Sequence, residues 1–313
     1  MTTTTRPVRP RRHRLTARAA LASATAGALL ATLAACGDGA APHGRAPVKP
    51  PTAKPAPAWR TDPRSIAALG DSITVGFDAC TVLSDCPEVS WSTGTSPKVN
   101  SLARRLLKEK PAAHSWNYAR TGALMSDLPQ QITQAAARKP ELVTVLIGAN
   151  DACRSDVRAM TAPAAFRTGF ERSMKALRKA LPRTQVYVAA VPDLLRLWSE
   201  GRKNPLGKQV WKLGICGSML RDPDDLAKPA QDRRALVRER VMAYNAALAD
   251  VCAQDALCRF DRSVFDYRFT GQQLSTWDWF HPGLGGQQEL AELAFRTVTR
   301  KENPLKSEAA SGE

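Results

Sequence analysis

The residues best suited to chemistry are Asp278 and His281, three positions apart near the C-terminus, and a serine that follows Gly70 and Asp71. Imidazole is the side chain whose unperturbed pKa suits removal of a serine proton near neutral pH. A nearby aspartate can orient the imidazole and stabilise its charged form. Ser72, His281 and Asp278 could therefore act together in nucleophilic catalysis if the fold brings them into contact.

Histidine is scarce in the sequence, which narrows the choice of base. Of the four histidines, His13 and His43 lie in an N-terminal region with the composition of a leader and a tether. That leaves His114 and His281 in the part that can form a globular domain. His114 follows a Pro-Ala-Ala run and is expected on the surface at the start of a strand. His281 is the histidine expected to carry chemistry.

The rest of the chain alternates short apolar runs with helical patterns, which is typical of a parallel sheet covered by helices. The expected strands are 65–69, 115–118, 142–147, 186–191 and 257–260. The expected helices are 99–108, 127–137, 163–180, 229–251 and 285–301, whereas residues 194–228 show no clear element. The continuous apolar run at 142–147 indicates a strand buried on both faces.

Active sites in such sheets lie at the carboxyl ends of the strands, and each candidate residue follows an expected strand. Ser72 follows the first strand and Gly122 follows the run at 115–118. The Gly-Ala-Asn-Asp sequence at 148–151 follows the clearest strand, and the Asp-x-x-His pair follows the last. Convergence of distant polar residues at one sheet edge is expected of an enzyme.

These segments resemble, in the same order, the four sequence blocks of the SGNH (GDSL-type) hydrolases. The matching segments are Gly70-Asp71-Ser72-Ile73, Gly122, Gly148-x-Asn150-Asp151 and Asp278-x-x-His281. Two departures exist: Ile73 stands where leucine is usual, and Gly122 lacks the Ser-x-Asn sequence that often precedes it. Residues 90–94 and 142–152 are also similar to the phospholipase-B-like branch of that family.

The resemblance implies a three-layer α/β/α fold like that of flavodoxin, and a serine esterase or lipase that uses no metal or cofactor. Ser72 would be the nucleophile, His281 the base, and Asp278 the residue that orients it. The oxyanion hole would consist of the backbone N–H groups of Ser72 and Gly122 and the side-chain amide of Asn150. The Gly-x-Ser-x-Gly elbow of the α/β-hydrolases is absent from the sequence.

Each motif also has a structural explanation, so other functions stay open. Ser72 could cap a helix, and the 148–151 sequence could form a plain turn. Asp278 could cap a turn while a backbone carbonyl orients His281. The substrate could be a phospholipid, an acylglycerol, a small acyl ester or an acetylated glycan. The alternatives are a carbohydrate acetylesterase and a lipid- or glycan-binding lipoprotein without turnover.

Six of the seven cysteines lie in the region expected to fold. In an exported protein, six cysteines support three disulfides. We expect sequential pairing, in which two bonds close short loops and one staples a long insertion: Cys80–Cys86, Cys252–Cys258 and Cys153–Cys216. Metal binding is the alternative, although the sequence has no C-x-x-C pair to support it.

The N-terminus has the pattern of an export signal. Residues 1–18 carry six arginines and no acid, and the apolar run at 19–35 is short for a bilayer span. The Leu-Ala-Ala-Cys sequence ending at Cys36 resembles a bacterial lipobox, in which the cysteine is lipidated after cleavage. We expect a lipid anchor on the outer face of the cell membrane, with a secreted protein as the alternative.

Beyond this signal, residues 36–58 are expected to form a Pro/Ala-rich disordered tether, 59–303 a single hydrolase domain and 304–313 a disordered tail. Removal of residues 1–35 lowers the formal charge from +16 to +10, which favours anionic lipid surfaces and a lipid substrate. No basic run is interleaved with aromatic residues, so nucleic acid is not an expected partner. We expect a monomer.

The long segment at 194–228 is expected to serve the substrate, because long loops within compact domains often carry function. Five of its large apolar residues are expected to line or cover the acyl-binding site: Leu194, Leu195, Leu197, Trp198 and Trp211.

Overall fold

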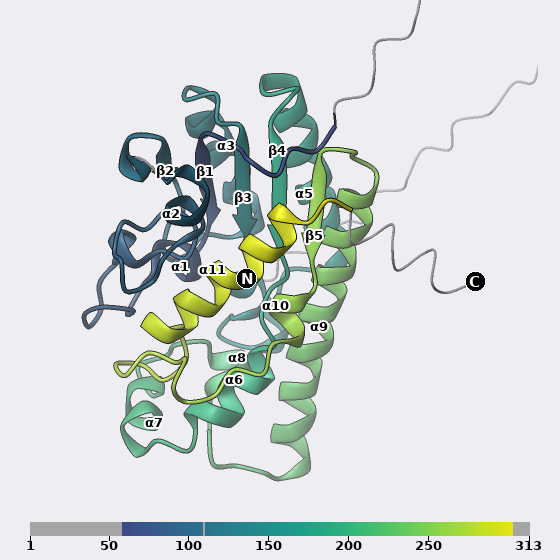
Figure 1. The fold of residues 1–313 in the computed structure, drawn as a ribbon. Helices are drawn as coiled ribbons and strands as arrows, with labels where there is room; N and C mark the ends of the chain where they lie inside the picture. The colour runs from purple at the N-terminus through teal and green to yellow at the C-terminus, as the bar shows by residue number, and fades with distance from the viewer. Residues whose placement is uncertain (1–57, 109, 303–313) are drawn as a thin grey trace, which may run out of the picture. The chain divides into compact units, whose positions relative to one another are not determined.

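A five-stranded parallel sheet organises the part of the chain that the computed structural model describes, residues 58–108 and 110–302 (Figure 1). The strands are β1 (Ile66–Gly70), β2 (Ser115–Asn117), β3 (Leu142–Leu146), β4 (Gln185–Ala189) and β5 (Cys258–Asp261). Their order across the sheet is β2-β1-β3-β4-β5, and all neighbours are parallel. This is the order of flavodoxin-like folds, so the expected fold class is confirmed.

Burial explains the apolar sequences of the strands. Every residue of β1, β3, β4 and β5 is buried, whereas the edge strand β2 is half-buried. Ala68 of β1 lies between Asn117 of β2 and Thr144 of β3, which fixes the register. The strand order reverses between β1 and β3, and ligands of such sheets bind at this point. Ser72 and Asn150 follow these two strands.

Helices cover both faces of the sheet (Figure 1). On one face, α3 (Leu128–Ala136), α5 (Pro163–Ala180) and α9 (Lys228–Ala253) pack side by side. On the other face, α11 (Leu284–Thr299) packs against α2 (Leu102–Leu107). The helix α2 begins three residues later than expected from the sequence, because the Ser101 hydroxyl accepts the Arg104 N–H and caps it.

The expectation of an irregular segment at 194–228 is wrong, because most of it is helical. It forms α6 (Leu194–Gly201), α7 (Pro205–Trp211) and α8 (Gly217–Leu220). The side chains of Asp193 and Asn204 accept N–H groups at the starts of α6 and α7. In α6 the buried residues recur with helical spacing: Leu194, Leu197, Trp198 and Gly201. These helices lie beyond the carboxyl ends of the strands, and α6 and α8 pack beside α9 (Figure 1).

Two arginines of α9 hold the end of this segment in place. Arg233 donates to the carbonyl oxygens of Gly217 and Ser218, and Arg234 donates to that of Asp222. The Arg234 guanidinium also lies 4.1 Å from the ring centroid of Trp198. The backbone of the segment therefore takes many of its hydrogen bonds from long side chains, which a local reading of sequence does not reveal.

The structure contains the three disulfides in sequential pairing: Cys80–Cys86, Cys153–Cys216 and Cys252–Cys258. The middle bond joins the residue after α4 (Ala149–Ala152) to the residue before α8. The expected leader, Cys36, the tether up to residue 57 and the expected tail lie outside the described residues. None of the described helices combines the length and apolarity needed to cross a membrane.

Candidate active site

Ser72 is positioned by a sharp turn between β1 and the four-residue helix α1 (Ser72–Val75). Gly70 has a φ of +150°, and a Cβ there would lie 2.2 Å from the Leu146 carbonyl oxygen, so only glycine fits. The Asp71 carboxylate caps α1 by accepting the Ile73 N–H at 3.0 Å. The turn places Ser72 at the carboxyl end of β1, as the sequence predicts.

His281 lies on a loop that runs from 274 to 283 and leads into α11. An antiparallel bridge between Leu274 and Pro282 closes the loop. Within it, the Ser275 N–H donates to the His281 carbonyl oxygen at 2.7 Å. The Asp278 carboxylate is fully buried and accepts the backbone N–H groups of Phe280 and His281 at 2.9 and 3.0 Å. The loop therefore fixes the orientation of Asp278 before any contact with the imidazole.

The fold brings Ser72 and His281 into hydrogen-bond contact. The Ser72 Oγ lies 2.9 Å from His281 Nε2, across a separation of 209 residues in sequence. The other ring nitrogen, Nδ1, bonds the second carboxylate oxygen of Asp278. Two aromatic rings flank the imidazole edge-on, with centroids 5.2 Å away for Phe77 and 5.9 Å away for Phe280. This is the geometry of a nucleophile, a base and an orienting acid.

Carboxyl groups around His281 determine its protonation. Burial is the largest single effect and disfavours the imidazolium, but the charge and hydrogen bond of Asp278 and the charges of Asp78 and Asp71 together outweigh it, so the pKa of His281 is raised above 6.5. Burial also opposes ionisation of Asp278, yet the charge of His281 and hydrogen bonds to its carboxylate lower its pKa. The pKa of Asp71 is raised to about 7, chiefly by burial.

Asn150 lies in the same cavity as Ser72 and His281. It is the second residue of α4, which begins after Gly148, a residue with a φ of +123°. One N–H of its amide donates to the Ala123 carbonyl oxygen at 3.0 Å. Because an amide NH₂ has two donors, this contact orients the group and leaves the second N–H for a ligand.

Gly122 is placed differently from the other expected oxyanion donors. It is exposed, has a φ of +81°, and is not among the residues that line the cavity of Ser72. A Cβ at Gly122 would have no atom within 4 Å, so its backbone conformation rather than close packing calls for glycine. Its neighbour Ala123 receives the Asn150 amide, which keeps the two loops together. A role for the Gly122 N–H stays a prediction.

The cavity at this site has a volume of about 190 Å³ and a mainly apolar wall. Its other lining residues come from α1, α4, α6, the segment before α8 and the His281 loop: Ile73, Ala149, Cys153, Leu194, Leu197, Ile215, Cys216, Phe280 and Pro282. Of the five residues expected to line it, Leu194 and Leu197 do so. Leu195, Trp198 and Trp211 do not line it.

Trp211 has a different place from the one expected. It is 3% exposed, and its indole N–H donates to the Asp278 carbonyl oxygen at 2.7 Å. Gly207 of α7 packs on the same loop, since a Cβ there would lie 2.7 Å from the Trp279 Cβ. The α6–α8 segment thus supports the loop that carries His281, as well as supplying two leucines to the cavity.

Gln287, on α11, joins the two halves of the site and was missed in the sequence. Its buried side chain donates to the Ile73 carbonyl oxygen at 2.9 Å and to that of Pro282 at 3.4 Å. Its amide oxygen accepts the Trp91 N–H at 2.8 Å. No local motif marks such a residue, because two of its partners, Ile73 and Trp91, come from distant segments. Asp151 is also structural, since its carboxylate accepts the Met125 N–H and the Thr161 hydroxyl.

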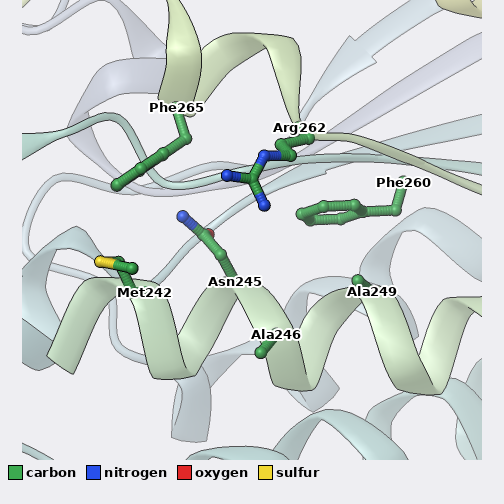
Figure 2. Close-up of a pocket in the computed structure, with 7 residues that line it drawn as sticks. All are labelled: Met242, Asn245, Ala246, Ala249, Phe260, Arg262 and Phe265. Carbon is green, nitrogen blue, oxygen red and sulfur yellow. The ribbon is translucent and has the colours of Figure 1, made fainter. Parts of the chain in front are cut away.

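A second cavity, of about 290 Å³, lies away from these residues between α9, β5 and α10 (Ser263–Asp266) (Figure 2). Its wall is mostly apolar, with Asn245 and Arg262 as its polar residues. The amide of Asn245 is bonded to both backbone groups of Val191, and Arg262 pairs with Asp266. Its polar groups are therefore engaged, and Ser72 and His281 do not line it.

The fold and this constellation define a doubly wound α/β protein with a serine, a histidine and an aspartate at the switch point of its sheet. A family model named GDSL-like Lipase/Acylhydrolase matches residues 66–294, and the chain belongs to this family. The match covers every candidate residue from Ser72 to His281. Membership supports carboxylic ester hydrolysis as the reaction. No curated protein matches the chain.

Solved structures with a similar fold share little sequence with the chain. LAE5, an alpha/beta hydrolase enzyme from the metagenome of Lake Arreo, is 18% identical, with 75% of this chain and 94% of that chain covered and a TM-score of 0.47. A putative GDSL-like lipase from Parabacteroides merdae is 18% identical, with 79% and 100% covered and a TM-score of 0.42. An extracellular lipase from Streptomyces rimosus is 18% identical, with 75% and 99% covered and a TM-score of 0.44.

Proposed function

We propose that the protein is a serine esterase that cleaves carboxylic esters through an acyl-enzyme on Ser72. The observation that carries this proposal is the chain of contacts from Ser72 Oγ to His281 Nε2, at 2.9 Å, and from His281 Nδ1 to Asp278. Such a chain activates an alcohol that is unreactive by itself. A serine that only capped a helix would not need a buried imidazole at its hydroxyl.

The chemistry follows from these positions. His281 Nε2 takes the proton of Ser72 as Oγ attacks the ester carbonyl carbon, and the imidazolium then protonates the leaving alcohol. A water next gives a proton to His281 and attacks the acyl carbon, which releases the acid and restores Ser72. Asp278 keeps the Nδ1 proton in place and stabilises the imidazolium throughout both steps.

The oxyanion is proposed to form between two donors at the end of the sheet and a third from the neighbouring loop. The Ser72 backbone N–H lies at the first position of α1, where a helix has no acceptor of its own. Asn150 lines the same cavity, and the second N–H of its amide is the next donor. The Gly122 N–H is the third donor. Removal of one such donor costs about 3 kcal/mol of transition-state stabilisation.

The cavity favours esters of short acyl chains over long-chain lipids. Its volume of about 190 Å³ is below the range of about 300–1,000 Å³ that is common for ligand pockets. Leucine, isoleucine and phenylalanine side chains form most of its wall, which suits an alkyl chain rather than a sugar. A narrow acyl site still accepts different alcohols, because the leaving group lies on the open side of the ester.

Hydrolysis of p-nitrophenyl esters tests this proposal. We expect turnover of the acetate and butyrate esters to fall by about 10⁴-fold or more in Ser72→Ala and in His281→Ala. The matched controls are Ser126→Ala and His114→Ala, which change exposed residues of the same types and should keep wild-type rates. Equal turnover in wild type and both site variants would show a binding protein instead. Release of acetate from acetylated xylan that is faster than hydrolysis of the p-nitrophenyl esters would favour the carbohydrate esterase.

The protein is also proposed to act outside the cytoplasm. Three disulfides in the described residues suit an oxidising compartment, which supports the export signal expected from the sequence. Metabolic labelling with a radioactive fatty acid should mark the wild-type protein and leave Cys36→Ser unlabelled. Export without any label would support secretion rather than anchoring.

A further inference from the structure

Asp78 is a buried acid near the candidate site that the proposed reaction does not use. It lies on the turn after α1, two residues before the loop that the Cys80–Cys86 disulfide closes. Its exposure is 1%, and its φ is +56°, in the left-handed region that few residues other than glycine, asparagine and aspartate adopt. A buried charge in an unfavourable backbone conformation needs an explanation in its surroundings.

The backbone around Asp78 fastens this loop to the loop of His281. The Ser275 hydroxyl donates to the Asp78 carbonyl oxygen at 2.6 Å. The Asp78 N–H donates to the Ser84 carbonyl oxygen at 3.0 Å, and one carboxylate oxygen of Asp78 accepts the Leu83 N–H. The backbone of Asp78 is therefore held from both sides, and the Leu83 N–H holds its carboxylate.

The carboxyl group of Asp78 faces the other two members of the buried cluster. One carboxylate oxygen each from Asp78 and Asp278 and a ring nitrogen of His281 lie within 4.8 Å of one another. We propose that Asp78 is a positioning residue of the site, which acts on His281 through its contact with Asp278 and through its charge. This inference rests on the proposed function only for its effect on turnover.

The charges around the cluster agree with this role. The groups that face Asp78 are Asp278 and His281, and the charge of Asp71 also acts on His281. Burial is the largest cause that raises the pKa of Asp78, and repulsion by Asp278 and a hydrogen bond that protonated Asp78 donates to Asp278 raise it further. Asp78 in turn raises the pKa of His281. A proton on Asp78 lets it donate to Asp278, and loss of that proton stabilises the imidazolium.

Two substitutions separate the hydrogen bond from the charge. Asp78→Asn keeps an acceptor for Leu83 and a donor toward Asp278, tolerates the left-handed conformation, and cannot ionise. Asp78→Gly suits the same backbone and removes the side chain altogether. The control is Glu88→Gln, which removes an exposed carboxylate from the same region of the chain. Neither Asp78 variant introduces backbone strain.

A pH titration of His281 monitored by NMR is the measurement that does not depend on turnover. We expect its midpoint in Asp78→Asn to be lower than in wild type by about half a pH unit or more, because a negative charge that favours the imidazolium is lost. The acid limb of kcat/KM should move to lower pH by a similar amount. Asp78→Gly should also lose about tenfold in kcat, whereas Asp78→Asn should stay within about threefold of wild type. Glu88→Gln should match wild type in the His281 midpoint, in the acid limb of kcat/KM and in kcat.

An unchanged His281 midpoint in folded Asp78→Asn would overturn the proposal, as would equal kcat in the asparagine and glycine variants. If both variants fail to fold, the carboxyl carbon of Asp78 can be titrated by NMR in the wild-type protein. An Asp78 titration midpoint at or below the ordinary aspartate value would then contradict the proposed role of Asp78. If Ser72→Ala keeps full turnover, the proposed function fails, but the NMR titration still decides the role of Asp78.

Discussion

Ser72 and His281 meet at one point, but the two sides of the site are built differently. Ser72 is fixed by its own neighbours, since Gly70 makes the turn and Asp71 caps the helix that Ser72 begins. His281 is on a loop held from outside, by Trp211 of α7 and by the turn that contains Asp78. One side follows from local sequence, and the other depends on segments 67 and 197 residues away.

This difference shows where a substitution can change the activity of the site while the fold stays intact. The nucleophile is placed by the core of the sheet, so a change there threatens the fold itself. The base is placed by peripheral contacts, so a change there can reduce activity while the sheet stays intact. Gln287 joins the two sides, because one amide group contacts both Ile73 and Pro282.

The strongest test of the His281 side is Asp278→Asn. The asparagine keeps the shape and the contacts to the backbone N–H groups but can present an N–H to Nδ1, which favours the wrong tautomer of His281. We expect kcat/KM to fall by about 10⁴-fold with little change in melting temperature. A loss below about tenfold would show that a backbone carbonyl or Asp78 can orient His281 without Asp278.

Removal of a disulfide that borders the cavity can be compared with removal of one that does not, by stability as well as by activity. Cys153–Cys216 closes a loop of 63 residues and borders the cavity, whereas Cys252–Cys258 closes 6 residues and does not line it. Replacing the first pair by serine should lower the free energy of unfolding in urea by about 4 kcal/mol, against about 2 kcal/mol for the second. The first change should also reduce kcat/KM about tenfold. Equal activity in both variants would contradict a role for the Cys153–Cys216 disulfide in shaping the cavity.

Trp211→Phe tests whether the support from α7 reaches the reacting atoms. The change leaves the Asp278 carbonyl oxygen without its indole donor, which should reduce kcat/KM about tenfold. Trp59→Phe is the matched control, because the Trp59 indole also donates to a carbonyl oxygen, that of Val298 at 2.9 Å. Both variants should lose similar stability in thermal unfolding. If both also lose similar activity, the contact of Trp211 has no special role.

The smallest effect concerns Asp71 on the Ser72 side. Its pKa is raised from 3.8 to about 7 in the folded protein, so folding holds its proton and stability falls as the pH rises from about 4 to about 7. Asp71→Asn removes this loss of stability with rising pH, because asparagine does not ionise, and its side-chain oxygen can still accept the Ile73 N–H. The melting temperature of the variant, relative to wild type, should therefore rise by about 3 °C or more between pH 4 and pH 8. The same difference at both pH values would show that Asp71 does not carry this proton.

The features that could be predicted from sequence are those fixed by local residues, as on the Ser72 side of the site. The buried strands and the amphipathic α5 follow from apolar runs and helical spacing, and α5 begins and ends at the expected residues, Pro163 and Ala180. The positions of Ser72, Asn150 and His281 follow from the rule that sites lie at strand carboxyl ends. Each of these inferences uses a signal within a few residues of the chain.

The features that were missed lack such a signal. The segment 194–228 was expected to be irregular because its helices are short and depend on the caps of Asp193 and Asn204 and on arginines of α9. Asp78, Trp211 and Gln287 have partners in distant segments, and their sequence neighbours do not mark them. The exception is α6, for which the helical spacing of Leu194, Leu197 and Trp198 after the capping residue Asp193 is a local signal.

Covalent labelling tests whether Ser72 becomes acylated with His281 as its base. A p-nitrophenyl alkylphosphonate transfers its phosphonyl group to an activated serine and releases p-nitrophenolate. We expect one phosphonyl group per chain, found by mass spectrometry on the peptide of Ser72, with ester turnover lost in step and much slower labelling in His281→Ala. Full turnover in a protein labelled at Ser72, or labelling confined to another residue, would contradict the account.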